Sequence, residues 1–406
     1  MMQIAIVGAG IGGLAAAVML HRAGHDVTLF ERFSAPRPVG SGLVIQPVGL
    51  AVLDALGAGQ AARAHGQAVR SMLGHDGARR VLQVAYPAGA PGLAMHRGSL
   101  FHVLWTQVAN SGVRVVTGAQ VMGAQVRGAQ VMGTKVIGAP LQGNRRVLLV
   151  QGGDPAGPFD LVVDAGGAQS PLSPLQARAL PFGAIWGHVP WPAQTGLPRD
   201  QLRQAYRGAA RMAGVLPIGP LPGDATPRAA VFWSMPVRDL DNWAGSDLRA
   251  WKAEVAGLWP AMVPFLAGIT ATDQMTTARY AHGTLARPYG PALVHIGDAA
   301  HRASPQLGQG ANMALLDALA LDVALAAHPV EDALAAYARL RRWHVRSYQA
   351  MSAAFTPMYQ SDSRVLPALR NHLLAPMSGW PVVRHMLTRL VAGDLLQPMA
   401  GVRMPG

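Results

Sequence analysis

The chain has 406 residues, of which half are hydrophobic and 14% are charged, so it is long enough for two packed domains and too apolar for a disordered protein. It contains no cysteine, which excludes disulfides, thiolate catalysis and thiolate metal sites, and we predict no metal site of another kind. The net charge of +13 is typical of some nucleic-acid-binding proteins, but the arginines are scattered in short pairs without interleaved aromatic residues, so we expect no nucleic-acid partner.

The first 32 residues alternate between strand and helix signals. Residues 3–7 form a short apolar run typical of a buried strand, residues 14–23 predict a helix that ends at Gly24, and residues 26–30 predict a second strand. No basic residue precedes the apolar run, so we interpret it as neither a signal peptide nor a membrane span. Since we find no other apolar run of membrane length, we expect a cytoplasmic protein.

The first strand and the helix are joined by the turn Gly8-Ala-Gly10-Ile-Gly12-Gly13. Gly8 permits the tight turn, Gly10 lets a pyrophosphate approach the backbone, and Gly13 lets the helix pack against the strand. The free N–H groups at the helix start then receive the anion. Glu31 lies 18 residues after Gly13, where a carboxylate can accept the ribose hydroxyls of an adenosine. The pattern predicts dinucleotide binding; a glycine-rich turn without a ligand is the alternative.

Strand and helix signals continue to residue 170. We expect a loop at 33–41, an extended segment at 42–47, a helix at 48–56, strands across 66–96, a helix at 97–109, and strands at 146–151 and 159–163. Arg97 is a candidate phosphate contact, and a solvated arginine at a helix start is the alternative. The last strand runs into the glycine-rich segment 164–170, where a backbone can approach a ligand.

A five-residue repeat, GAQVM and its variants, occupies residues 118–138. A solenoid needs longer units to bury a core, so we interpret the repeat as a duplicated stretch that lengthens a strand or hairpin and carries no chemistry.

Residues 180–290 are richer in Trp, Tyr, Met and Pro than the rest of the chain. Strand-like runs lie at 184–189, 202–212, 229–235 and 276–281, a helix at 246–256 would begin at an N-cap Ser246, and a short helix is expected at 259–266. We assign this block to a mostly antiparallel sheet that covers the cofactor and forms a substrate pocket. The candidate pocket residues are Trp186, His188, Tyr206, Arg207, Arg211, Met212, Trp233, Met235 and Tyr280.

If the run 202–212 is one strand, its alternation places some of these candidates on opposite faces. On one strand Arg203, Arg207 and Arg211 would share a face, and Tyr206 and Met212 would share the other. An inward arginine would indicate a carboxylate substrate, whereas we expect Tyr206 and Met212 to point inward.

The chain then returns to the first domain. Residues 292–296 predict a strand, Gly297-Asp298 follows it, and glycines lead into a helix at 312–327. Residues 331–396 predict amphipathic helices broken at Pro357, Pro367, Pro376 and Pro381, whose apolar positions we interpret as core or interface rather than as a membrane anchor.

Four segments of the chain resemble the FAD-dependent aromatic monooxygenases of the para-hydroxybenzoate hydroxylase type, the class A flavoprotein monooxygenases. They are the GAGIGG turn with Glu31-Arg32, the HRGSL segment at Arg97, the glycine segment that ends at Ser170, and the run from Gly297-Asp298 through His301 and Pro305 to Gly308-Gln309-Gly310-Ala311-Asn312 with Asp317. The resemblance covers about the first 330 residues, and the last segment is the most specific.

The resemblance implies an α/β fold: a Rossmann-like FAD-binding domain, an inserted antiparallel substrate domain and a helical C-terminal region. We assign residues 1–175 and 286–330 to FAD binding, with an excursion to the substrate layer at 66–96, residues 176–285 to the substrate domain, and 331–406 to the C-terminal region. The implied cofactor contacts are Gly8, Gly10, Gly12, Gly13, Glu31, Arg32, Val44, Arg97, Val121, Asp298, Gly308, Gln309, Gly310, Ala311 and Asn312.

The implied reaction uses NADH or NADPH to reduce the flavin, and O2 to oxygenate a small aromatic or heteroaromatic substrate through a flavin C4a-hydroperoxide. Pro305 would shape the flavin face, and Tyr206 and Arg211 would contact the substrate. His301 is interpreted as structural rather than as a base. We expect a monomer or homodimer without a membrane span.

One segment departs from the family pattern. Gly166 and Gln169 stand where the family carries Asp and Arg, in a segment associated with FAD and NAD(P)H contacts, and Asp164 is a partial substitute. A flavoprotein oxygenase or halogenase fed by a separate reductase therefore remains an alternative, as does a non-catalytic flavin-binding protein.

Overall fold

The computed structural model describes residues 1–33, 42–118, 121–126, 131–132, 135–136, 145–150 and 154–404. Nearly all of the expected loop at 33–41 lies outside these ranges, so that interpretation stays a prediction. About half of the five-residue repeat is described, and it holds the strand β9 (Val121–Val126) and the antiparallel pair β10 (Val131–Met132) and β11 (Lys135–Val136), in agreement with a lengthened strand or hairpin.

A six-stranded sheet has the order β20-β21-β14-β1-β2-β8, in which only the edge strand β20 runs antiparallel to its neighbour. Val7, the last residue of β1, lies beside Phe30 of β2 and Asp164 of β14. The residues that follow these strands therefore meet at one edge, where α/β folds of this kind bind dinucleotides. Its strands are β1 (Gln3–Val7), β2 (Asp26–Glu31), β8 (Arg114–Thr117), β14 (Leu161–Asp164), β20 (Tyr289–Gly290) and β21 (Leu293–His295).

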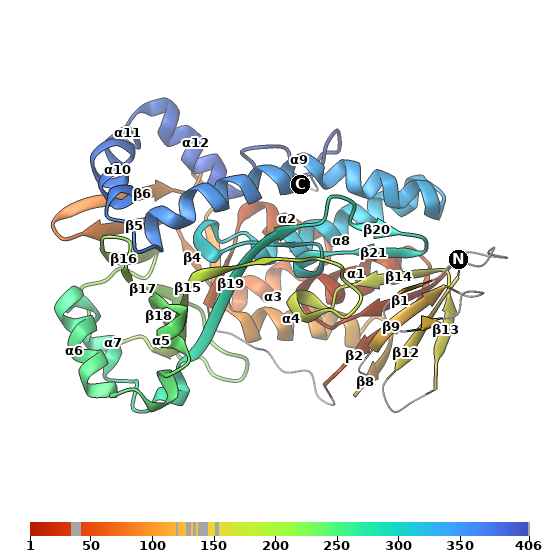
Figure 1. Ribbon diagram of the computed structural model, residues 1–406, viewed down its shortest axis with the longest axis horizontal. Coiled ribbons are helices and arrows are strands. Elements are labelled where there is room, and N and C mark those ends of the chain that lie inside the picture. The colour runs from red at the N-terminus through yellow and green to blue at the C-terminus, as the bar shows by residue number, and fades with distance from the viewer. Residues whose placement is uncertain are drawn as a thin grey trace.

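Helices pack around this sheet, and they bury the largest core of the described chain. Helix α1 contacts both α4 and α8 (Figure 1). The α1–α8 contact is close, because a Cβ built on Gly12 would lie 3.3 Å from the Cβ of Ala314. The helices of this layer are α1 (Ile11–Arg22), α2 (Pro47–Ala55), α3 (Gly59–Ala64), α4 (Arg97–Ala109) and α8 (Gly310–Ala327).

An eight-stranded sheet forms the second layer, with the order β22-β19-β15-β18-β17-β16-β5-β6. It is mostly antiparallel, as expected, with β16 and β5 as a parallel pair. Its strands are β5 (Ser71–Asp76), β6 (Arg79–Ala85), β15 (Arg178–Pro190), β16 (Gln201–Arg207), β17 (Arg211–Ile218), β18 (Arg228–Pro236), β19 (Thr276–Thr284) and β22 (His301–Arg302).

The expected single strand at 202–212 is wrong, because the run is a hairpin of β16 and β17. Its turn contains Gly208 in the left-handed region, with φ of 61°. Tyr206 pairs with Met212 and Arg207 with Arg211 across the two strands. Both members of a cross-strand pair project from the same face. The arginines and the pair Tyr206 and Met212 therefore still lie on opposite faces, as predicted, and Tyr206 and Met212 are buried.

Three small sheets complete the strands, with the orders β3-β7-β4, β13-β12-β9 and β10-β11. The expected strand at 159–163 is divided, since Phe159 ends β13 and β14 begins at Leu161. The strands are β3 (Gly42–Ile45), β4 (Gly66–Val69), β7 (Gly92–His96), β9 (Val121–Val126), β10 (Val131–Met132), β11 (Lys135–Val136), β12 (Arg146–Val150) and β13 (Ala156–Phe159).

Short helices cover one face of the large sheet, which we call the outer face; they are α5 (Val237–Leu240), α6 (Leu248–Leu258) and α7 (Val263–Leu266). The N-cap of α6 is Asp247 and not Ser246 as expected. Its carboxylate accepts from the N–H groups of Arg249 and Ala250, at 2.8 and 3.1 Å. A carboxylate serves this role well because it also meets the positive end of the helix.

The C-terminal region is helical, comprising α9 (Val330–Tyr359), α10 (Val365–Leu369), the π-helical turn η7 (Arg370–Leu374), α11 (Ala375–Met377) and α12 (Pro381–Ala392). The expected break at Pro357 is wrong, since α9 continues to Tyr359. Pro367 and Pro376 also lie inside helical segments, whereas Pro381 stands at a boundary as the first residue of α12.

One helix of the layer around the six-stranded sheet has the composition of a membrane span. In the described chain α8 alone is long and apolar enough to cross a membrane, but 56% of it is buried inside the protein. We therefore interpret α8 as a core helix.

Candidate functional site

The glycine turn lies at the carboxyl edge of the parallel sheet. Gly8 has φ of 104°, and a Cβ there would lie 2.5 Å from the carbonyl oxygen of Ala165. A Cβ on Gly13 would lie 2.0 Å from the Gly8 carbonyl oxygen. Both positions therefore require glycine for packing within the protein. Gly10 differs, because it is exposed and a Cβ there would meet no protein atom closer than 3.9 Å.

The space in front of Gly10 is suited to an anion. Gly10 is the N-cap of α1, and the N–H groups of Ile11, Gly12 and Gly13 have no helical partner because the first bond of the helix runs from Leu14 to Gly10. Three free donors at the positive end of a helix favour a phosphate group.

Glu31 ends β2 beside this turn. Its side chain is 8% exposed, and its two oxygens accept from the N–H groups of Ala9 and Phe33 at 2.7 and 3.1 Å. Each carboxylate oxygen has a second lone pair. The carboxylate is therefore held in place by the backbone and retains acceptor capacity for a ribose.

A second helix start, that of α8, is built in the same way. Gly308 adopts φ of 61°, Gln309 is the N-cap, and the helix begins at Gly310. The first bond of α8 runs from Met313 to Gln309, so the N–H groups of residues 310–312 have no helical partner. This helix start can also stabilise negative charge.

The Asn312 side chain fixes this helix start to β3. It is fully buried, its oxygen accepts from the Gln46 N–H at 2.8 Å, and its nitrogen donates to the carbonyls of Val44 and Gly308 at 3.2 and 3.0 Å. Gln46 in turn accepts from the Tyr86 hydroxyl at 2.6 Å. The sequence left Gln46 without a role, and its partners lie too far along the chain for a local pattern to reveal one.

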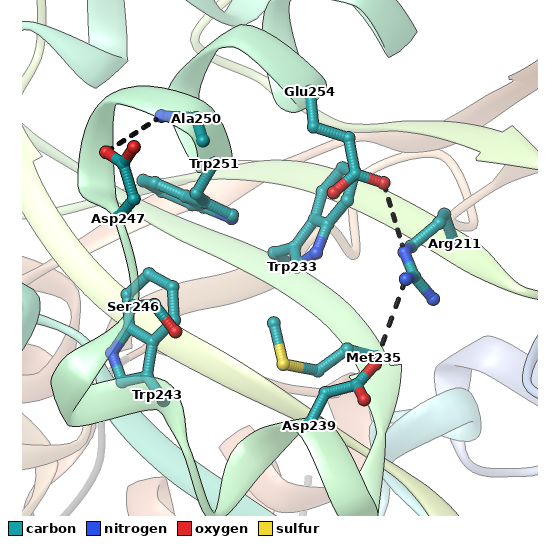
Figure 2. A pocket seen from close by; sticks show the side chains of 10 residues that line it. All are labelled: Arg211, Trp233, Met235, Asp239, Trp243, Ser246, Asp247, Ala250, Trp251 and Glu254. Atoms are coloured by element: carbon teal, nitrogen blue, oxygen red, sulfur yellow. Dashed lines mark hydrogen bonds and ion pairs between the residues drawn. The ribbon is translucent and has the colours of Figure 1, made fainter.

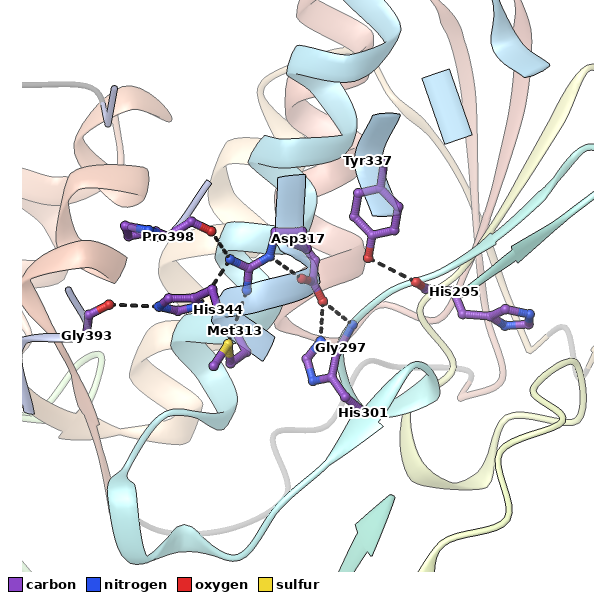
Figure 3. Close-up of polar contacts among 10 residues, drawn as sticks. His295, Gly297, His301, Met313, Asp317, Tyr337, His344, Gly393 and Pro398 are labelled. Carbon is purple, nitrogen blue, oxygen red and sulfur yellow. Dashed lines mark hydrogen bonds and ion pairs between the residues drawn. The ribbon is translucent and has the colours of Figure 1, made fainter. Parts of the chain in front are cut away.

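A buried ionic network supports the turn that contains Asp298 (Figure 3). The carboxylate of Asp317 on α8 accepts from the Gly297 N–H at 2.9 Å, from His301 at 2.7 Å and from the Arg341 guanidinium at 2.8 Å. Burial alone would raise the pKa of Asp317, but His301 and Arg341 outweigh it and hold that pKa well below its usual range. The contact of His301 with Asp317 fits the interpretation of His301 as a structural residue, which stays a prediction.

Arg341 extends the network to the C-terminal segment. It donates to the Pro398 carbonyl at 2.5 Å and contacts Nδ1 of His344 at 3.2 Å, while Nε2 of His344 lies 2.8 Å from the Gly393 carbonyl. Burial and the Arg341 charge lower the pKa of His344 to about 3. The neutral ring therefore accepts from Arg341 and donates to Gly393.

The segment that departs from the family pattern is held by internal hydrogen bonds of Asp164. Asp164 is fully buried and accepts from the Gly166 N–H at 3.0 Å and the Ser170 hydroxyl at 2.6 Å, and its other oxygen contacts His295 at 2.7 Å. Asp164 is committed to these internal partners, which argues against its acting as a substitute for the missing acid. A Cβ on Gly166 would lie 3.0 Å from Ser170.

The other predicted cofactor residues belong to elements of the FAD-binding part. Arg97, Asp298 and Pro305 are exposed, and Arg32 donates to the Gln169 side chain at 3.3 Å. Val121 begins β9, and its side chain lies outside the described part of the structure. Their contacts with a cofactor stay predictions.

The family model described as "FAD binding domain" matches residues 1–136 and 232–351, more than half of the chain. The chain belongs to the FAD binding domain family. FAD is accordingly its cofactor, and the two helix starts and Glu31 fit that group: the space before Gly10 is open, and the buried carboxylate keeps acceptor capacity.

Similar proteins cover almost the whole length of this FAD-binding chain. The aurachin C monooxygenase/isomerase of Stigmatella aurantiaca is 27% identical, over 93% of this chain and 94% of that protein. The FAD-dependent urate hydroxylase of Mycolicibacterium vanbaalenii is 25% identical, over 97% and 98%. The solved structure of Klebsiella pneumoniae HpxO with FAD and uric acid has a TM-score of 0.78 at 20% identity, over 97% and 98%, and shares the fold.

The predicted pocket residues of the FAD-binding chain divide between the two faces of the large sheet. Trp186 stacks on Phe232 and donates to the Tyr280 hydroxyl at 2.9 Å, and Tyr206 and Met212 belong to the same cluster as Phe232. We call this the inner face, because neighbouring residues of the same sheet pack against Val44 of the FAD-binding part. His188 also lies close to that part, with its ring 4.8 Å from the ring of His96.

The remaining candidates lie on the outer face. Arg211, Trp233 and Met235 line a pocket of about 300 Å³ under α6 (Figure 2). Arg211 is paired there with Glu254 at 3.2 Å and with Asp239 at 3.8 Å. Arg211 therefore lies on the outer face and is already paired with two carboxylates. Its predicted contact with the substrate is not supported, and neither is the inference of a carboxylate substrate.

Proposed function

We propose that the chain is an FAD-dependent monooxygenase that uses NADH or NADPH and O2 to hydroxylate a small aromatic or heteroaromatic compound. The observation that carries the proposal is the combination of two free helix starts and the buried Glu31 in a chain of the FAD binding domain family. Relatives named as monooxygenases and hydroxylases, matched over nearly their whole length, support the reaction type.

In this proposal the residues of the sheet edge hold FAD at both ends. The N–H groups of Ile11, Gly12 and Gly13 bind the pyrophosphate, and Glu31 accepts from the adenosine ribose. The N–H groups at the start of α8 face the flavin ring and stabilise its negative charge. When bound, the flavin supplies electron transfer from the nicotinamide and oxygen transfer to the substrate.

The inner face of the large sheet holds the substrate in this proposal. Trp186 is only partly buried and offers an aromatic surface that suits an aromatic ring, whereas Phe232, on which it stacks, and Tyr206 are themselves buried. Burial raises the pKa of Tyr280 to about 12, so its hydroxyl keeps its proton at neutral pH and can donate a hydrogen bond. Pro305 shapes the flavin side and excludes water.

The first test is a visible spectrum of the purified protein, followed by NADH and NADPH oxidation in air with a panel of phenols and aromatic acids. Bound oxidised flavin shows bands at roughly 375 and roughly 450 nm. Substrate-stimulated oxidation with a hydroxylated product supports the proposal. A protein that binds no FAD, or a reduced flavin that yields no oxygenated product with any panel compound, counts against it.

A second candidate is a flavoprotein oxygenase fed by a separate reductase. The observation that favours it is the Gly166 and Gln169 pair, which removes a carboxylate and a guanidinium from the segment beside η5 (Gly297–Ala299). Chemically reduced enzyme would then hydroxylate its substrate, whereas neither nicotinamide would reduce the flavin.

The proposal assigns residues 1–175 and 286–330 to FAD binding and residues 176–285, with 66–96, to the substrate layer. We place the enzyme in the cytoplasm as a monomer or homodimer. Gel filtration with light scattering tests the oligomeric state.

A further inference from the structure

Large exposed apolar side chains are concentrated in the C-terminal helices. Among the described residues, eleven large hydrophobic side chains are exposed, and six of them lie between residues 365 and 386. Figure 1 shows α10, α11 and α12 together at one end of the molecule, beside β5 and β6. The six are Val365, Leu369, Leu373, Trp380, Val382 and Met386, with exposed fractions from 40% to 75%.

The spacing of these residues is that of helical stripes. Val365, Leu369 and Leu373 recur every four residues along α10 and η7, and Val382 and Met386 do so on α12, with Trp380 between the helices. Helix α12 already buries a different set, including Leu390 and Val391, against the protein. The exposed apolar residues of α12 are therefore distinct from the apolar residues that pack this helix against the protein.

The same segment is basic. Residues 363–393 hold four arginines and two histidines and neither aspartate nor glutamate, and the acids Asp362 and Asp394 stand at its two ends. Arg370 is buried and paired with Asp76 at 2.8 Å, and Arg389 is paired with Asp394 at 3.2 Å. Arg364 and Arg384 are exposed and make no ion pair with the described residues.

We propose that this segment, with the six apolar residues and the exposed Arg364 and Arg384, binds the face of an anionic lipid bilayer, which differs from the sequence interpretation of these positions as core or interface. Helices that lie on membranes combine apolar and aromatic side chains with arginines that meet anionic headgroups. A second copy of the chain fits less well, because a twofold interface is self-complementary and would bring unpaired arginines together without an acid in the segment. The inference is independent of the reaction catalysed.

The test is co-sedimentation of the full-length protein with vesicles of phosphatidylcholine alone or mixed with phosphatidylglycerol. Binding is expected with the anionic vesicles and is expected to weaken as salt is added. The double variant Arg364→Gln/Arg384→Gln should bind about 25-fold more weakly, at about fivefold per arginine. The triple variant Trp380→Ser/Val382→Ser/Met386→Ser should lose binding.

A control makes one change of each kind elsewhere on the surface. Val263, 48% exposed, and Arg70, with a side chain 71% exposed, lie outside the segment. Val263→Ser/Arg70→Gln should bind as wild type, and circular dichroism should show that every variant folds. Equal binding to neutral vesicles overturns the proposal. The proposal is also overturned if the wild-type protein does not bind anionic vesicles but self-associates in sedimentation equilibrium, and the triple variant abolishes that self-association.

Discussion

The substitution Asp317→Asn tests whether the buried network holds the cofactor loop in place. Asp317 is fully buried and serves three donors, among them the guanidinium of Arg341, which is 3% exposed. The asparagine side chain has only one acceptor oxygen, and its NH2 group would face N–H donors of the network. It also leaves the buried Arg341 charge without a counter-ion.

The expected loss follows from that unpaired charge. Removing one partner of a buried ion pair costs about 3–5 kcal/mol, against about 5–15 kcal/mol for the whole stability of a typical protein. We therefore expect urea unfolding of Asp317→Asn at pH 7 to give a free energy lower by about 3–5 kcal/mol. FAD should also bind more weakly, because the single amide oxygen cannot replace both the carboxylate oxygen shared by Gly297 and His301 and the one that accepts from Arg341.

A control substitution on the same helix, at Asp322, is expected not to lower the free energy of unfolding. Burial raises the pKa of Asp322, so its charged form is disfavoured in the folded protein. Asp322→Asn should leave the free energy of unfolding unchanged or raise it slightly. If Asp317→Asn costs less than about 1 kcal/mol, the network does not carry the energy that a buried pair implies.

Three further predictions concern the site and its supports. Gly10→Ala should fold but bind FAD at least about tenfold more weakly, because its Cβ enters the open phosphate space; flavin titration measures this. Asn312→Ala should cost about 2–3 kcal/mol in urea unfolding, because Gln46 and two carbonyls lose their partners. His344 has a pKa lowered to about 3, so stability is lost as pH falls below about 6.5, by up to about 1.4 kcal/mol per pH unit. His344→Gln should flatten that dependence in urea titrations between pH 7 and pH 5.

Local periodicity was sufficient for the elements that carry the cofactor turn. The apolar run of β1, the glycines and the acid of Glu31 lie within one short segment, so their spacing alone predicts how they meet. The hairpin of β16 and β17 was missed because Gly208 is followed by two alanines, which give no turn signal.

Long-range contacts could not be predicted in the same way. Asn312 and Gln46 are 266 residues apart, and Asp317 meets Arg341 only because α8 packs on α9. The motif marked Asp317 and Asn312 by resemblance, but only the folded chain shows what each side chain holds. Both turn out to support backbone segments of the FAD-binding part.

The sequence and the structure together bear on which residues, or which partner protein, supply electrons to the flavin. Asp164 cannot stand in for a missing acid while both its oxygens serve Gly166, Ser170 and His295. A side chain at position 166 would also press on Ser170 at 3.0 Å, so restoring an aspartate there requires Ser170 to move. The segment is thus packed around a glycine at position 166. Nicotinamide reduction must then rely on other residues of the site, or electrons must come from a partner protein.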